Sequence, residues 1–124
     1  MKPIQPGILD PVPAFARYLV FDLAPEAGPG PALLRLAKSV DAQQTVVGIG
    51  RSTVLALGHD VPGLRDFPAA TARGIEIPAT HGALWCWLRG DDRGELVHRT
   101  RALEAVLAPA YRSGAVLDAF RHRE

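Results

Sequence analysis

The residue types that could bind a metal or act as nucleophiles are four histidines and one cysteine in a chain of 124 residues. The histidines are His59, His81, His98 and His122. Their spacings match no ligand pattern, since the sequence has neither a pair of cysteines nor a His-Glu-x-x-His string. The sequence therefore favours structural or surface roles for the histidines and assigns no metal ligand.

The cysteine, Cys86, stands between Trp85 and Trp87 in an apolar run. A thiol in such a run is expected to be buried and unreactive, and a single cysteine forms no internal disulfide, which favours a reducing compartment. The two tryptophans could carry electrons to a redox group. Such pairs more often pack in an interface, and we expect that role here.

Two further strings resemble chemical motifs. Residues 48–53 (GIGRST) follow an expected strand, but they lack the lysine of a P-loop and the third glycine of a dinucleotide fingerprint, so a turn is predicted. Asp91 and Asp92 are adjacent acids, and Asp92 has Glu95 three residues later. That spacing is typical of a helix cap rather than of paired catalytic acids.

The composition indicates one compact domain. With 48% apolar residues and a formal net charge of +1, the chain is too apolar for disorder and too weakly basic for nucleic acid to be its main partner. The longest apolar run, residues 83–88, is far shorter than the roughly 20 residues of a spanning helix. The first residues, MKPIQP, contain neither a signal core nor a twin arginine. We expect a cytoplasmic protein without a membrane partner.

Proline and glycine divide the chain into segments. Residues 1–13 hold four prolines and no apolar period, so we expect an extended arm there and a single domain over 14–124. Within this domain the patterns predict strands at 15–23, 45–49, 84–89 and 114–121 and helices at 31–40 and from the Asp92 cap to Leu107, with a helical turn at 52–57 and a short edge segment at 75–77.

This order of elements, βαββαβ, predicts a ferredoxin-like α+β sandwich, a four-stranded antiparallel sheet with two helices on one face. Such a sheet needs only one apolar face. Here both alternating sets of side chains are apolar: Leu19, Phe21, Leu84, Cys86 and Leu88 on one side, and Tyr18, Val20, Trp85 and Trp87 on the other.

A second apolar face of this size would exceed the patches that monomers normally expose. Burying about 600 Å² of it would contribute on the order of 15 kcal/mol before the entropy of association. We therefore expect Tyr18, Val20, Trp85 and Trp87 to form an interface with another sheet or layer. The alternative is that residues 58–82, rich in Pro and Gly, fold back over this face as a lid.

Several strings together resemble the N-terminal domain of dye-decolourising (DyP-type) haem peroxidases. They are QPGIL at 5–9, VGIG at 47–50, PGLRDFP at 62–68, the run from Leu84 through Arg93, and DAFR at 118–121. Each string is weak alone, but they occur in the right order along the whole chain. The resemblance implies a ferredoxin-like domain whose sheet faces that of a second such domain, with haem between them on the C-terminal side.

The resemblance also implies hydrogen-peroxide-dependent oxidation of dyes, phenols or metal ions, carried out with an axial His, a distal Asp in a Gly-x-x-Asp-Gly motif and a distal Arg. This chain matches none of the three. Its closest string, GDDRG at 90–94, has the acids too early. We therefore assign no catalytic residue. We expect these 124 residues to lack the family's C-terminal haem-ligating domain, and the chain alone to bind no haem and to be inactive.

Two classes of function stay open. In the first, the chain is the N-terminal half of a DyP-type peroxidase, as part of a split, truncated or longer protein, and a C-terminal half supplies the haem ligands. In the second, two copies stack their sheets as a homodimeric α+β barrel that encloses a small-molecule pocket and acts as a cofactorless oxygenase or a binding protein. Both readings predict an oligomer.

Overall fold

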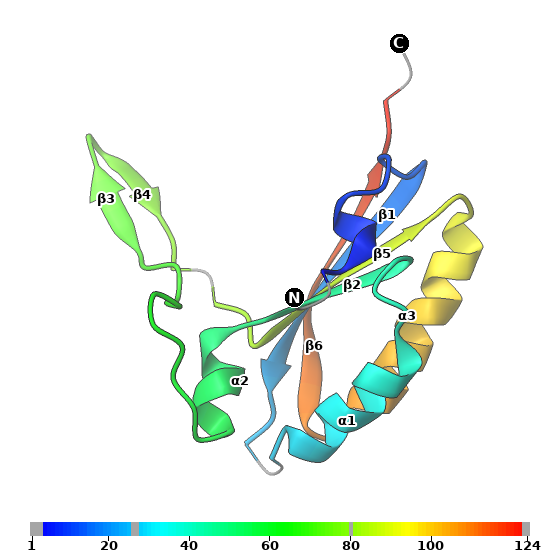
Figure 1. Ribbon diagram of the computed structural model, residues 1–124. Coiled ribbons are helices and arrows are strands. Elements are labelled where there is room, and N and C mark those ends of the chain that lie inside the picture. The colour runs from blue at the N-terminus through cyan, green and yellow to red at the C-terminus, as the bar shows by residue number, and fades with distance from the viewer. Residues whose placement is uncertain (1–3, 26–27, 80, 123–124) are drawn as a thin grey trace.

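Four antiparallel strands form the main sheet of the computed structural model, which describes residues 4–25, 28–79 and 81–122 (Figure 1). The strand order is β2-β5-β1-β6. The strands are β1 (Phe15–Leu23), β2 (Thr45–Ile49), β5 (Leu84–Gly90) and β6 (Tyr111–Phe120). Helices α1 (Gly30–Ser39) and α3 (Arg93–Leu107) cover one face. The predicted ferredoxin-like sandwich is therefore confirmed.

Local sequence explains where the two long helices begin and end. Pro31 lies in the first turn of α1, where its missing N–H has no intrahelical partner to lose. The Asp92 carboxylate accepts a hydrogen bond of 2.9 Å from the Gly94 N–H, which is the predicted cap of α3. Arg35 of α1 donates to the backbone oxygens of Val106 and Ala108, at 3.0 and 3.1 Å, and so ties the end of α3 to α1.

The hydrophobic core lies between this helical layer and the sheet. Of the two apolar sets of side chains on the strands, the one formed by Leu19, Phe21, Leu84, Cys86 and Leu88 faces the helices. The helices contribute Leu36, Leu96, Leu103 and Leu107, and all nine side chains are buried. Each large side chain removed from water in this way contributes about 1.5–3 kcal/mol to folding. The helical layer thus buries one of the two apolar faces of the sheet.

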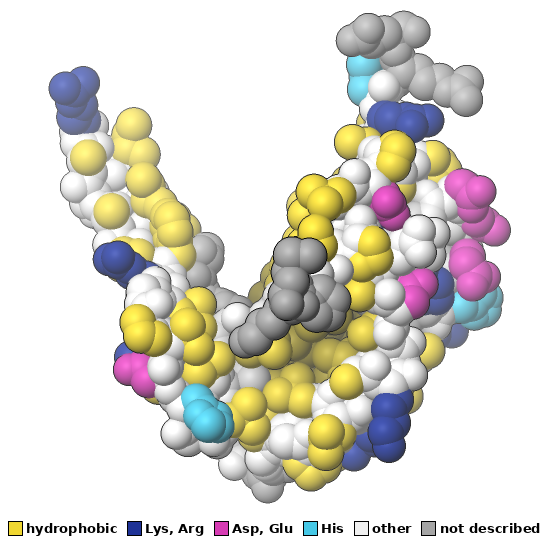
Figure 2. All heavy atoms as spheres, in the orientation of Figure 1, with side chains coloured by type: hydrophobic (Ala, Val, Ile, Leu, Met, Phe, Trp, Pro, Cys, Tyr) yellow, Lys and Arg dark blue, Asp and Glu magenta, His cyan; other side chains and the backbone are white. Residues whose placement is uncertain are grey.

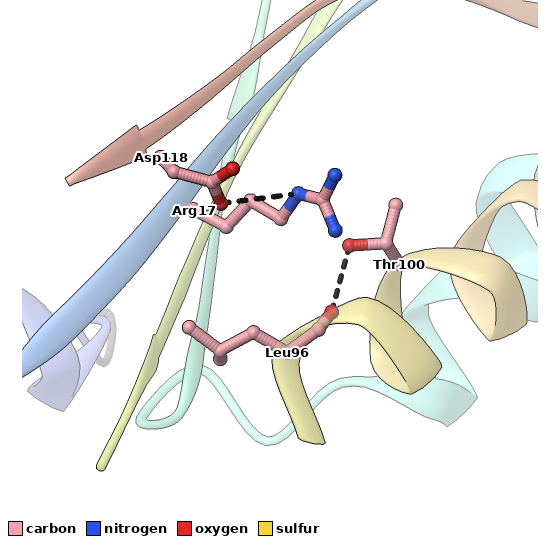
Figure 3. Close-up of polar contacts among 4 residues, drawn as sticks. All are labelled: Arg17, Leu96, Thr100 and Asp118. Atoms are coloured by element: carbon pink, nitrogen blue, oxygen red, sulfur yellow. Dashed lines mark hydrogen bonds and ion pairs between the residues drawn. The ribbon is translucent and has the colours of Figure 1, made fainter. Parts of the chain in front are cut away.

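The polar contacts beneath α3 lie at one edge of this core. Thr100 is buried and its hydroxyl donates to the Leu96 oxygen at 2.8 Å, within the helix. Arg17 of β1 extends from the sheet toward Thr100, and its Nε lies 3.5 Å from an Asp118 carboxylate oxygen of β6 (Figure 3). The ion pair offsets the arginine charge under the helix. Val97 of α3 lies outside the buried stripe of the helix and is 39% exposed.

Between β2 and β5 the chain leaves the body of the domain. The short helix α2 (Arg51–Ala56) follows β2, and a separate hairpin, β3 (Ala70–Ala72) with β4 (Ile75–Ile77), projects away from the main sheet (Figure 1). The alternative in which residues 58–82 form a lid over the sheet is wrong, because most of this stretch is exposed and it stands apart from the sheet face. The pairing strand β3 was not predicted.

The N-terminal segment, expected as an extended arm, contains one turn of 3-10 helix, η1 (Pro6–Ile8). Among the described residues no helix is both long enough and apolar enough to cross a bilayer.

Candidate functional site: the uncovered face of the sheet

The four residues predicted to form an interface lie together on the sheet face opposite the helices. Tyr18 of β1 is directly opposite Trp87 of β5, and Val20 is opposite Trp85. Opposed residues in an antiparallel ladder point to the same side of the sheet, which fixes all four on one face. The alternation read from the sequence is thus correct.

Three of these side chains form an aromatic cluster. The Tyr18 ring lies 5.9 Å from the Trp85 ring and 6.1 Å from the Trp87 ring, centroid to centroid, in stacked geometry. The two indoles are 6.3 Å apart and tilted by 39°. Such contacts stabilise aromatic pairs by about 0.5–1.5 kcal/mol beyond burial. The cluster is therefore a preformed platform, and Trp85 leaves 37% of its surface open.

The edge strands extend the platform on both sides. On β6, Leu117 is opposite Tyr18 and Ala115 is opposite Val20, and Leu117 is 64% exposed. On β2, Gly48 is opposite Trp85. A Cβ on Gly48 would lie 3.3 Å from the indole of Trp85, so the absence of a side chain leaves room for that ring. The result is an apolar surface that spans all four strands.

The N-terminal arm closes one end of this face. The side-chain amide of Gln5 pairs with β2 as a strand would, donating to the Val47 oxygen and accepting from the Val47 N–H, each at 2.8 Å. Gly7 then passes so close to the chain that a Cβ there would lie 2.3 Å from the Gln43 oxygen. Val46, on the same face as Trp87, is only 2% exposed as a consequence.

Arg89 lies under this arm and is 4% exposed. Its guanidinium stacks 4.5 Å above the Trp87 ring and donates to the Pro11 oxygen. In the described part of the chain, the Arg89 Nη1 and the Trp87 Nε1 are buried without a hydrogen-bond partner. An unpaired buried donor costs about 1–3 kcal/mol, which the cation–π contact offsets in part.

An open hollow of about 390 Å³ lies where the sheet face meets the base of the hairpin segment. Its lining is Val20, Gly48, Ile49, Gly50, His81, Gly82 and Trp85. Two backbone segments pass close together here, since a Cβ on Gly50 would lie 1.8 Å from the Gly82 oxygen. The volume suits a small molecule or a protruding side chain.

The other candidates from the sequence do not assemble into a site. The described residues contain no cluster of three or more His, Cys, Asp or Glu side chains placed to hold a metal. His81 borders the hollow and its Nδ1 lies 3.8 Å from Asp66, whereas His59, His98 and His122 are exposed elsewhere on the surface.

Cys86 and the GIGRST string both turn out to be structural. Cys86 is fully buried, and burial raises the pKa of its thiol to about 12, so the reactive thiolate is absent near neutral pH. The string joins the end of β2 to the start of α2, and its Thr53 hydroxyl is directed inward, 2.7 Å from the Ala83 oxygen and 2.9 Å from the Tyr111 hydroxyl. The predicted unreactive thiol and the predicted turn are consistent with this geometry.

No family model matches this sequence, and no curated protein does. Solved structures do match the fold. A DyP-type peroxidase protein from Shewanella oneidensis aligns with 94% of this chain at a TM-score of 0.77 and 19% identity. DyPB from Rhodococcus jostii RHA1 aligns with 91% at 0.76 and 16% identity, and a dye-decolorizing peroxidase from Bacteroides thetaiotaomicron with 91% at 0.72 and 15% identity.

The chain shares its fold with DyP-type peroxidases. It spans 41–42% of the length of each of these three structures. Variants of the Rhodococcus protein have been solved in complex with haem. The resemblance predicted from short strings is thus confirmed at the level of the fold, while sequence identity is too low to transfer individual residues.

Some residues of the face were missed by sequence reasoning. Arg89 has the same strand parity as Trp85 and Trp87, so the alternation alone could have placed it on this face. The pairing of Gln5 with β2 has no local sequence signal, because the two segments lie 42 residues apart and meet only in the folded chain.

Proposed function

We propose that this chain is the N-terminal half of a DyP-type haem peroxidase, which oxidises dyes, phenols or similar donors with hydrogen peroxide. In this proposal the chain supplies scaffold and interface, and a C-terminal half supplies the haem ligands. Two findings support it: the fold is shared with DyP-type peroxidases, and the chain spans about two fifths of those proteins.

The observation that carries the proposal is the uncovered aromatic face. Tyr18, Trp85 and Trp87 are prearranged there, and Leu117 leaves 64% of its surface open beside them. A patch of this chemistry in water favours association with a second apolar surface. A second sheet of the same architecture would cover all four strands at once.

The residues of this chain fit a wall beside haem better than a set of ligands for it. All four histidines have exposed side chains, and His81 alone borders an apolar hollow. The hollow offers glycine backbone and the edge of Trp85, which suit contact with a flat apolar group. When bound, haem would supply the peroxide chemistry. The contribution of this chain is shape and the exclusion of water, and no residue here is assigned as an iron ligand.

The test compares the chain with and without its C-terminal half. Absorption spectra and peroxide turnover are measured on the purified chain, and again after addition of the haem-binding half that carries the Gly-x-x-Asp-Gly motif. We expect neither a Soret band nor turnover from the chain alone, and both from the mixture. A stable homodimer that retains a small ligand and ignores the added half would overturn the proposal in favour of an α+β barrel.

A further inference from the structure

The β3–β4 hairpin has two chemically different faces. Its strands are joined by Arg73 and Gly74, both with positive φ (52° and 77°), a backbone typical of tight hairpin turns. In the ladder Ala70 pairs with Ile77, Thr71 with Glu76 and Ala72 with Ile75. One face of the ribbon is therefore apolar, formed by Ala70, Ala72, Ile75 and Ile77, while the other carries Thr71 and Glu76.

The apolar face of this ribbon is exposed. Ile75 is 66% exposed and Ile77 is 44% exposed, and the other four hairpin residues are exposed as well. An isolated two-stranded hairpin is at best marginally stable in water. A ribbon with one apolar face gains stability when that face packs on a second surface.

The position of the hairpin indicates which surface this is. Figure 1 shows β3 and β4 on an arm that rises from the region of α2, opposite the uncovered side of the main sheet. Figure 2 shows a wide hollow between arm and body, with hydrophobic side chains on its floor and along the side of the arm that borders it. At the base of the arm, Val20, Ile49 and Trp85 contribute apolar side chains to the lining of the 390 Å³ hollow.

We infer that the hairpin arm clasps the layer that covers the sheet, so that the partner is held between two apolar walls. The inference rests on the proposed function, under which this layer belongs to the C-terminal half of the peroxidase. The partner surface that meets the arm is apolar and uncharged, because it packs on Ile75 and Ile77. Thr71 and Glu76 on the opposite face remain in water.

The test uses the assembly that contains the haem-binding half and compares two single variants of the arm. Ile75→Lys puts a charge on the apolar face, and Thr71→Lys puts the same charge on the polar face of the same hairpin. Hydrogen exchange of the amides at 70–77 is measured in each assembly. Ile77→Ala, which adds no charge, provides a second and milder change of the apolar face.

We expect the arm amides to be protected in the wild-type assembly and in Thr71→Lys. Ile75→Lys should lower that protection at least about tenfold, and Ile77→Ala should lower it less, because each removes apolar contact with the partner. The thermal midpoint of the isolated chain serves as a control and should be the same in all variants, since the arm is separate from the core.

The outcomes separate the inference from the proposed function. An assembly with bound haem whose arm amides exchange freely in the wild type overturns the clasp and leaves the proposed function standing. If no haem-binding half associates with the chain, both the inference and the proposed function are wrong. If the same variants instead abolish self-association of the chain alone, the arm binds a second copy and the inference is wrong.

Discussion

The Tyr18 ring of β1 stacks on the Trp85 ring of β5 with their planes inclined by only 17°. The two residues belong to adjacent strands but are not directly opposite each other, since Tyr18 is paired with Trp87 and Val20 with Trp85. Their rings therefore reach diagonally across the sheet. A single aromatic surface results, and a partner that binds it meets rings that are already ordered, which lowers the entropic cost of binding.

A charge on this platform should prevent the partner from binding. Trp85→Arg removes a large apolar contact and places a guanidinium where the interface excludes water. We expect association with the haem-binding half to weaken by at least about 2 kcal/mol, or roughly 30-fold, as at interface hot spots. Light scattering and the Soret absorbance of the mixture measure this loss.

The matched control for that substitution is Val97→Arg. Val97 is exposed to a similar degree, 39% against 37% for Trp85, but lies on α3 on the other side of the sheet. It should leave association unchanged. An unaltered oligomeric state in Trp85→Arg would contradict the idea that this face is covered.

The sequence predicts most of the sheet because its strands are locally encoded. The strand at Phe15–Leu23 matches in every residue, since this segment is rich in apolar and aromatic residues and ends shortly before Pro25. β6 begins at Tyr111, before the predicted start at Gly114. Gly114 lies where the pairing with β1 shifts register, and a Cβ there would lie 2.7 Å from an Asp22 carboxylate oxygen.

The positions of the N-terminal arm and of the β3–β4 hairpin could not be predicted, because they depend on tertiary contacts and not on local sequence. Ala70–Ala72 has little strand propensity of its own and becomes β3 only by pairing with Ile75–Ile77. No local pattern in the sequence indicates that the hairpin projects away from the main sheet. The aromatic face, in contrast, was visible in the alternation of Trp85 and Trp87 with Cys86.

The close approach of Gly7, in the N-terminal arm, to Gln43 and Val46 predicts a stability effect. In Gly7→Ala the new Cβ would lie 2.3 Å from the Gln43 oxygen and 2.7 Å from Val46, so arm or strand must move. We expect a loss of about 1–3 kcal/mol in the free energy of unfolding, measured with urea. Gly28→Ala is the control, because a Cβ there meets nothing within 4 Å. Equal stability of the two variants would show that the arm does not hold this position.

The buried thiol predicts a dependence of stability on pH. Burial raises the pKa of Cys86 from 9.0 to about 12, so the folded state keeps the proton while the unfolded state loses it above pH 9. The stability from this group is complete below pH 9 and is lost as pH rises toward 12, by up to about 1.4 kcal/mol per pH unit. Urea titrations between pH 8 and 10 measure the loss.

Comparison with Cys86→Ala separates the contribution of the thiol to the pH dependence of stability from the contributions of other titratable groups. The variant should show a flatter profile between pH 8 and 10. Tyr111, whose pKa burial also raises, contributes equally in both proteins and therefore cancels in the comparison. Iodoacetamide should label the wild-type thiol at neutral pH only after unfolding. Rapid labelling of the folded chain would contradict a closed core around β5.

The cap of α3 gives a prediction with a neighbouring control. Asp92→Ala removes the carboxylate that accepts from the Gly94 N–H at 2.9 Å, leaving a donor at the helix start without its partner. We expect a loss of about 0.5–2 kcal/mol in the free energy of unfolding. Asp91→Ala, one residue earlier and also exposed, removes the same charge without the cap and should cost less. If the two losses were equal in urea titrations, the effect would come from net charge near the helix start and not from the cap, because only Asp92 bonds to the backbone there.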